Sequence, residues 1–269
     1  MNEEYRYLMK TAETEEEAFA RLSRIMEVLR ENCPWDREQT YESLRPCMIE
    51  EAYEVAEAID SGDRDNLKEE LGDVTLQVMF HTLLAQEEGA FTRTDVLNEE
   101  CEKMIRRHPH IFNDIEIKTV DKVLEKWENI KQKEHREGSH SDRLKDVPKA
   151  LPALIRASKV QSRAARVGFD WDDAGGAFEK IAEETEELTA AFRNDNYDEM
   201  CEELGDLLFA VVNTARFLDV EPENALERAT EKFIGRFTSM EEMAEDEGND
   251  LEGMTLAQLD DLWERAKTK

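Results

Sequence analysis

The chain contains the stretch EELGDLLFAVVNTARFL at residues 202–218, and its first five letters, EELGD, occur a second time at residues 69–73. After Asp206, apolar residues cover most of the circumference of a helix, which predicts that the helix is buried. The residues after Asp73, VTLQVMFHTLL, predict the same. An acidic turn that leads into an apolar helix, present twice, indicates an all-α fold built by duplication.

The duplication extends well beyond five letters. The pattern EE-x-x-E followed by EE-x-x-D occurs in both halves, and each acid lies 133 positions before its counterpart, as Glu51 does before Glu184. Trp-Asp precedes both patterns, and Trp-x-x-x-Lys closes both halves. The segment at residues 131–152 between them is polar, with one Gly and two Pro, which predicts a loop. We therefore expect domains at residues 1–135 and 151–269, with a linker at 136–150.

The charge balance excludes several classes of partner. The 65 acidic and 35 basic residues give a formal net charge of −30, which argues against nonspecific binding to nucleic acid or to an anionic membrane. No apolar run is long enough to span a membrane, and the acidic start lacks the apolar core of a secretory signal. Four scattered cysteines indicate reduced thiols, so we expect a cytoplasmic protein. A solubilising surface, as in salt-adapted proteins, would also account for the charge.

The positions of the acids favour a metal site over a solvated surface. Residues three apart share a helix face, and the turn-forming sequences at 61–66 and 193–198 predict antiparallel hairpins. Each hairpin would bring four carboxylates together. These are Glu51, Glu54, Glu70 and Asp73 in the first half, and Glu184, Glu187, Glu203 and Asp206 in the second. Gly72 and Gly205 would let a neighbour or ligand approach closely. Carboxylate oxygens select Mg²⁺ or Mn²⁺, and no His has the spacing that a di-iron site needs.

Basic and aromatic residues around the second set of acids suit a phosphorylated ligand. Lys180 lies one helical turn before Glu184, while Lys232 and Arg236 share a helix face, so these cations could bind the outer phosphates of a nucleotide. Trp263 could stack on a base, or it could anchor the last helix to the core. The chain has neither a G-x-x-x-x-G-K-[ST] loop nor a G-x-G-x-x-G motif, so neither a P-loop enzyme nor a Rossmann domain is supported.

Several motifs together resemble the MazG family of nucleoside triphosphate pyrophosphohydrolases. They are CPWDREQT (33–40), IEEAYEV (49–55), EELGDV (69–74), RRHPHIF (106–112), WENIK (127–131), LPALIRA (151–157), VGFDW (167–171) and EELGDLLFAVVN (202–213). The resemblance implies a four-helix-type all-α domain that occurs twice per chain and assembles as a homodimer. It also implies Mg²⁺-dependent hydrolysis of an NTP or dNTP between the α and β phosphorus, giving NMP and pyrophosphate, with Mn²⁺ as a possible substitute.

The resemblance also implies roles for individual residues. The metal ligands would be Glu184, Glu187, Glu203 and Asp206; the phosphates would meet Lys180, Lys232 and Arg236; Trp263 would contact the nucleoside, and Lys131 would also reach the site. A carboxylate beside the attacking water, Glu183 or Glu187, would take its proton. Glu199 stands where some members carry a basic residue, which puts one phosphate contact in doubt.

The two halves are not expected to be equivalent. The position 133 residues before Lys180 is Cys47, so the first copy lacks the lysine that would meet a phosphate. We therefore expect catalysis in the C-terminal domain and a regulatory or assembly role in the N-terminal domain, where Glu51, Glu54, Glu70 and Asp73 would keep residual metal binding. The alternatives are a nucleotide-sensing or partner-binding helical dimer without catalysis, and a purely structural one.

Overall fold

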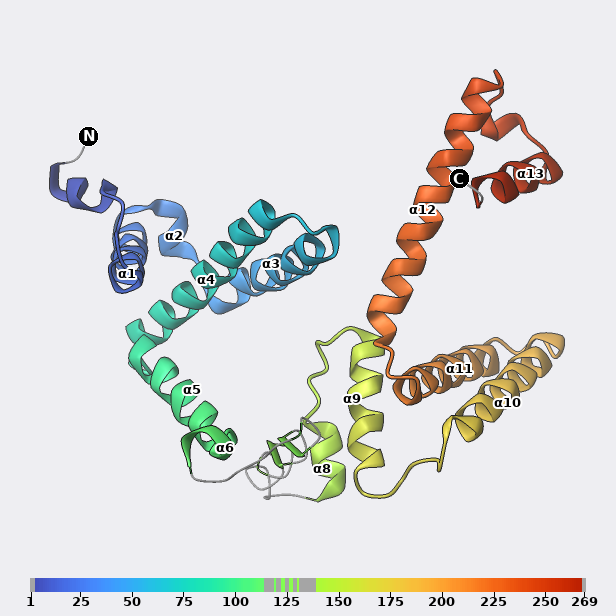
Figure 1. Cartoon of the computed structure of the whole chain (residues 1–269), viewed down its shortest axis with the longest axis horizontal. Helices are drawn as coiled ribbons and strands as arrows, with labels where there is room; N and C mark the ends of the chain where they lie inside the picture. The colour runs from blue at the N-terminus through green and yellow to red at the C-terminus, as the bar shows by residue number, and fades with distance from the viewer. Residues whose placement is uncertain are drawn as a thin grey trace. The chain divides into compact units, whose positions relative to one another are not determined.

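A computed structural model describes residues 3–113 and 139–267, with six isolated positions between these ranges at 119, 122, 123, 126, 127 and 130. The chain divides into two compact units, Met1–Lys133 and Glu134–Lys269, and each is described by itself. Within the described ranges every regular element is a helix, which confirms the all-α prediction (Figure 1).

Unit 1 is built around a helical hairpin. Its helices are η1 (Glu3–Met9), α1 (Glu15–Asn32), α2 (Pro34–Glu38), α3 (Tyr41–Ser61), α4 (Arg64–Glu87), α5 (Arg93–Arg107) and α6 (Pro109–Phe112). Helices α3 and α4 pack against each other, and α1 packs on both α2 and α4. Thr40 and Ser43 form a capping box that fixes the start of α3, and the Asp63 side chain accepts from two backbone N–H groups at the start of α4.

Unit 2 repeats the hairpin and adds a C-terminal helix pair. Its helices are α8 (His140–Lys145), α9 (Ala153–Ala165), α10 (Ala174–Arg193), α11 (Tyr197–Phe217), α12 (Pro222–Asp246), η2 (Leu251–Gly253) and α13 (Leu256–Ala266). Helices α10 and α11 form the hairpin, and α9 packs on α11. Helix α12 contacts α9 and α11, then leads away from the hairpin and pairs with α13 (Figure 1). The prediction of an unbroken loop at 131–152 is wrong over α8, which a Ser139–Asp142 capping box nucleates.

The duplication predicted from the acids holds at the level of helix boundaries. Helix α10 begins 133 positions after α3, and α11 begins 133 positions after α4. The turn between the helices also has the same backbone in both units. Gly62 (φ 73°) and its counterpart Asp195 (φ 51°) both adopt the left-handed conformation. Gly accepts this conformation freely, and Asp is among the few other residues that tolerate it, so both turn sequences allow the same reversal.

The two units differ in where their cores lie. In unit 1 a cluster of large buried side chains fills the space between α1, α3 and α4; its members are Met26, Leu44, Met79, Phe80, Leu83 and Leu84. In unit 2 the apolar cluster lies between α12 and α13 instead, and consists of Met240, Ala244, Leu262 and Ala266. The hairpin of unit 2 buries mainly small residues, such as Ala177 and Ala210.

Burial of the helix after Asp206 is the prediction that needs correction. Ala210, Val212 and Thr214 are buried, but Leu208 and Val211 remain 50% and 44% exposed. Helices α9, α10 and α12 contact α11, but in the described part of the chain they leave the side with Leu208 and Val211 open. The two glycines of EELGD also lack the expected close neighbour, because a Cβ at Gly72 or Gly205 would meet nothing within 4 Å beyond its own helix backbone in the described residues.

Two predictions about the type of protein can be compared directly with the described residues. None of the helices in the described ranges is both long and apolar enough to cross a bilayer. All four cysteines carry free thiols, as their spacing predicted.

Candidate metal and nucleotide site

The hairpin of unit 2 gathers the predicted carboxylates. Glu184 and Glu187 lie one turn apart on α10, Glu203 faces them from α11, and one carboxylate oxygen from each lies within 4.8 Å of the others. Asp206, one turn after Glu203, lines the adjoining cavity together with Glu184. The structure thus brings three of the four predicted ligands into one group and places the fourth beside it.

Repulsion within this group favours a bound cation. Partial burial raises the pKa of Glu187 above its ordinary value, and the charges of Glu184 and Glu183 raise it further. Burial likewise raises the pKa of Glu203, with contributions from Glu187, Glu184 and Asp206. Carboxylates that repel one another in a partly desolvated space resist ionisation until a positive charge joins them.

Lys180 supplies one such positive charge. Its Nζ lies 3.0 Å from Glu183 Oε1 and also pairs with Glu184, whose side chain is almost fully buried. These two carboxylates hold the pKa of Lys180 above its ordinary value. An unpaired buried carboxylate is costly, so the ion pair with Lys180 stabilises the fold. The pair also shows that these carboxylates attract a positive charge.

The donor set fits a hard divalent cation. At Mg²⁺–oxygen distances of about 2.1 Å, oxygens in an octahedron lie about 3 to 4 Å apart. The three carboxylate oxygens, within 4.8 Å of one another, need only small side-chain rotations to reach that spacing. They also leave room for phosphate oxygens and water, which Mg²⁺ generally keeps among its ligands.

A cavity of about 660 Å³ opens beside the carboxylates. Lys180, Glu184 and Asp206 lie on its wall, and the rest of the lining comes from Leu144 of α8, from α9, α10 and α11, and from the loop at 168–171. Most of the remaining lining is apolar, with Gln161 and Asn213 as amide groups on the wall. This volume and this mixture of groups are typical of a small-molecule site.

The loop before α10, residues 167–173, is held in place by two contacts. The indole of Trp171 packs so closely on the first turn of α10 that a Cβ at Gly176 would lie 2.9 Å from it. Asp170 accepts hydrogen bonds from both Nη atoms of Arg216, at 2.9 Å for Nη1, and Asn213 Oδ1 accepts from Arg216 Nε at 3.1 Å. The loop is therefore fixed to α10 and α11 at the edge of the cavity.

Sequence reasoning missed this cavity and its polar lining. Gln161 and Arg216 lie outside the quoted motifs, and Asp170 and Asn213 lie in VGFDW and EELGDLLFAVVN without a role of their own. The signal that could have found them is the comparison of halves, because Asn213 and Arg216 stand 133 positions after Phe80 and Leu83. Where polar residues replace large apolar ones in an otherwise duplicated helix, that face of the helix is expected to line a cavity or the surface instead of an apolar core.

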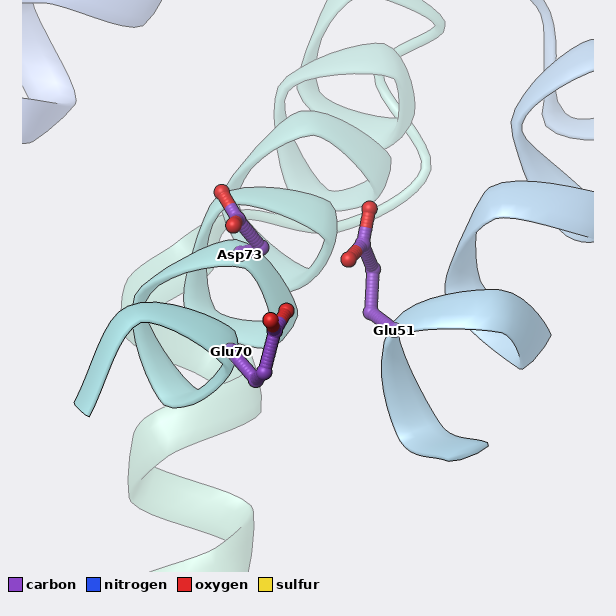
Figure 2. A group of neighbouring side chains, drawn as sticks. All are labelled: Glu51, Glu70 and Asp73. Carbon is purple, nitrogen blue, oxygen red and sulfur yellow. The ribbon is translucent and has the colours of Figure 1, made fainter. Parts of the chain in front are cut away.

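Unit 1 retains the carboxylates but not their surroundings. Glu51 on α3 faces Glu70 and Asp73 on α4, with one oxygen of each within 4.8 Å of the others (Figure 2). Glu54 stands outside that group of three, but its charge adds to the effect of burial in raising the pKa of Glu51 and Glu70. Cys47 occupies the position of Lys180, so these carboxylates have no lysine one turn before them.

The other predicted ligand-binding residues lie apart from the carboxylates. Lys232 and Arg236 belong to α12 and Trp263 to α13, and none of the three lines the cavity. The Trp263 ring packs 5.2 Å from that of Phe233, and the Arg236 guanidinium lies 5.7 Å from its centroid. Their roles remain predictions. Lys131 falls outside the described residues.

Comparisons with known proteins agree with the motifs. The family model of the MazG nucleotide pyrophosphohydrolase domain matches twice, at residues 39–112 and 177–240. A relative from Thermotoga maritima, named nucleoside triphosphate pyrophosphohydrolase/pyrophosphatase MazG, is 49% identical over 93% of this chain and 95% of its own length. A nucleoside triphosphate pyrophosphohydrolase from Escherichia coli K12 is 42% identical over 92% and 96%.

A solved structure, that of a MazG-related protein from Thermotoga maritima, matches with 29% identity over 42% of this chain and 98% of its own. Its TM-score of 0.38 is too low to inform the arrangement of the helices.

Proposed function

The chain belongs to the MazG nucleotide pyrophosphohydrolase family and is a nucleoside triphosphate pyrophosphohydrolase, and from that premise we propose that unit 2 carries the reaction with Mg²⁺ as the preferred cation. The observation that supports this location is the group of Glu184, Glu187 and Glu203, which has Lys180 beside it and a cavity of nucleoside size next to it. Unit 1 has the carboxylates without the lysine.

The proposed reaction is hydrolysis at the bond between the α and β phosphates. The oxygen of a water forms a bond to phosphorus, the bridging P–O bond breaks, and pyrophosphate leaves with the bonding electrons. Glu184, Glu187, Glu203 and Asp206 would hold a cation, which would neutralise phosphate charge and acidify water. Glu187 or Glu183 would take the proton of the attacking water as general base.

In the proposed reaction, Lys180 exchanges its carboxylate partners for a phosphate oxygen of the substrate. Without substrate its ammonium pairs with Glu183 and Glu184. With Glu184 engaged in a cation site, the ammonium of Lys180 would turn to a phosphate oxygen of the substrate, where a charge-assisted hydrogen bond would orient the leaving group. The strongly acidic chain repels anionic nucleotides at long range, so local cations of this kind are needed to hold the triphosphate.

A homodimer would complete the site. Large apolar side chains are exposed on α11 and α12, among them Leu208, Phe233 and Phe237. Large apolar side chains that are exposed in one copy are often covered in an assembly. We propose that a second copy covers these faces and that Lys232, Arg236 and Trp263 then approach the triphosphate and the nucleoside, since none of the three lines the cavity of its own unit.

The test is the identity of the product. Wild-type protein is incubated with Mg²⁺ and each common NTP and dNTP, and pyrophosphate, orthophosphate and the nucleotide product are quantified separately. Pyrophosphate and NMP in equal amounts, lost on chelation of Mg²⁺, support the proposal. Orthophosphate and NDP as first products would contradict the cleavage position, and full activity with excess chelator would contradict the role of the cation.

A further inference from the structure

Gln77 of α4 is a buried polar side chain of unit 1 that the proposed reaction does not use. It is 5% exposed, and its Oε1 has no hydrogen-bond partner in the part of the chain that the structure describes. Buried polar atoms without partners are rare in folded proteins, so a cation or a hydrogen-bond donor from outside the chain is the expected partner of this oxygen.

The position of Gln77 on α4 places it beside the carboxylates of unit 1. It follows Glu70 by seven residues and Asp73 by four, so the three share the face of α4 that meets Glu51 of α3 (Figure 2). Side chains of a helix lean toward its N-terminus, so we expect the amide to lie over the turn that carries Asp73. One turn further on, Phe80 belongs to the apolar core and offers the amide no polar contact.

At the same level of its hairpin, unit 2 carries a lysine instead of an amide oxygen. Lys180 stands 133 positions after Cys47, and Ala210, which has no polar side chain, stands 133 positions after Gln77. Lys180 pairs with Glu184, so its ammonium competes with a metal ion for that carboxylate. A metal ion that binds unit 2 must therefore displace an ion pair first.

Unit 1 lacks this competitor at the corresponding position. The Cys47 thiol carries no positive charge, and Lys68, the lysine nearest to Glu70 in the sequence, pairs with Asp65 at 3.6 Å. The three carboxylates of unit 1 are half-buried and lie within 4.8 Å of one another. Together with the Gln77 oxygen they form an all-oxygen donor set, which hard divalent cations such as Mn²⁺ and Ca²⁺ prefer.

We propose that unit 1 binds a hard divalent cation between Glu51, Glu70, Asp73 and Gln77 Oε1 in the absence of nucleotide, and binds it more tightly than unit 2 does. Glu51 comes from α3 and the other three ligands from α4, so the cation holds the hairpin together. This role goes beyond the residual binding predicted from the acids. It does not rest on the proposed function, because no step of the reaction takes place in unit 1.

Binding of Mn²⁺ alone to the full chain measures both units. Free Mn²⁺ is followed by electron paramagnetic resonance during a titration without nucleotide, for wild type, Glu70→Gln and Glu203→Gln. Wild type should show two classes of site whose Kd values differ by about tenfold or more, since unit 1 has one more ligand and no ion pair to displace. Glu70→Gln should remove the tighter class, and Glu203→Gln the weaker one.

Three further variants test the reasons for this difference. Gln77→Leu, of similar size, removes the amide oxygen and should raise the Kd of the tighter class by about tenfold or more, because loss of a ligand weakens a metal site. Cys47→Lys adds the competitor that unit 2 has, and should also raise that Kd; it stays informative if Gln77→Leu folds poorly. In unit 2 the matched variant Lys180→Met should lower the Kd of the weaker class.

Hydrogen exchange gives a second readout, which does not depend on separating two classes of site. Mn²⁺ should slow exchange in peptides of α3 and α4 of wild type, because the cation joins the two helices. In Gln77→Leu the slowing should be smaller at the same Mn²⁺ concentration. Without Mn²⁺, exchange in this variant should be no faster than in wild type, because no buried unpaired amide remains.

Three results would overturn the proposal. One is loss of the tighter class in Glu203→Gln while Glu70→Gln keeps it. Another is a Gln77→Leu variant that binds Mn²⁺ as wild type does, which would mean that the amide serves only to donate to a carboxylate. The third is a wild type that binds no Mn²⁺ until nucleotide is added. None of these measurements involves release of pyrophosphate, so they are distinct from failure of the proposed function.

Discussion

Units 1 and 2 are copies of one helical hairpin that use the same space in different ways. Both place three carboxylates from facing helices within 4.8 Å of one another. Behind the carboxylates, unit 1 packs Leu44, Phe80 and Leu83 into a core, whereas unit 2 leaves a cavity lined by Asn213 and Arg216. Facing carboxylates are therefore common to both copies of the fold, whereas the cavity and the lysine beside the carboxylates are described in unit 2. We expect the first feature to serve cation binding and the second to serve nucleotide binding.

The largest expected difference between the units is in catalysis. Glu203→Gln should lower kcat/KM for pyrophosphate release by more than about 100-fold, since it removes a charge that holds the cation at the reacting phosphates. The matched variant Glu70→Gln in unit 1 should change it by less than about twofold. Steady-state assays on both purified variants check this. A large loss in Glu70→Gln would show that unit 1 takes part in the reaction.

The next difference is in stability. Phe80→Ala should destabilise unit 1 by about 3–5 kcal/mol, because a fully buried ring leaves a cavity behind. Asn213→Ala, at the same position of unit 2, should cost less than about 1 kcal/mol, because its side chain already borders open space. Hydrogen exchange of α4 and α11 peptides in denaturant reports each unit separately. Equal losses would mean that the cavity wall of unit 2 is packed as tightly as a core.

Lys180 should account for a smaller part of the difference in activity. Lys180→Met should lower kcat/KM by about 10–100-fold, since a charge-assisted hydrogen bond to a phosphate is lost. The reciprocal change, Cys47→Lys, restores the cation beside Glu51 but leaves the core of unit 1 closed. Combined with Glu203→Gln, it should not recover activity. Recovery in the double variant would show that the lysine alone separates the two units.

How far the sequence could predict these features depends on the kind of information each one needs. Helical periodicity and turn residues are local, so the hairpins and the carboxylates Glu184, Glu187 and Glu203 follow from spacing alone. The cavity depends on how α9 lies against α11, which spacing does not specify, and so Gln161 carried no signal. Exposure of Leu208 and Val211 was missed for a related reason. Apolar residues around a helix predict that it is buried, but they do not specify whether its own domain or another chain covers it.

The smallest expected effect concerns acidity, and it should be common to both units. Burial and mutual repulsion raise the folded-state pKa of Glu187 and Glu203, and those of Glu51 and Glu70, above the ordinary value. Protonation of these groups therefore stabilises the fold below the unfolded-state pKa, and that stabilisation is lost as pH rises through the folded-state pKa. Mg²⁺ needs the ionised form, so its stabilisation should grow from pH 5 to pH 8.

At pH 8 and saturating Mg²⁺ we expect the melting temperature to rise by about 5 °C, and by much less at pH 5. Differential scanning fluorimetry at both pH values, with Ca²⁺ and K⁺ as controls, measures this. If the increase at pH 5 equals or exceeds that at pH 8, the carboxylates are not the binding groups.

The attachment of the loop at 167–173 bears on how long a ligand stays bound in the cavity. Asp170 and Arg216 hold this loop through paired charged hydrogen bonds, and Trp171 rests on Gly176, so the rim of the cavity is fastened at two points. If the product leaves past this rim, loosening either attachment would widen its path. The dwell time of the product would then be set by the strength of an ion pair, and rising ionic strength, which screens that pair, would shorten each visit.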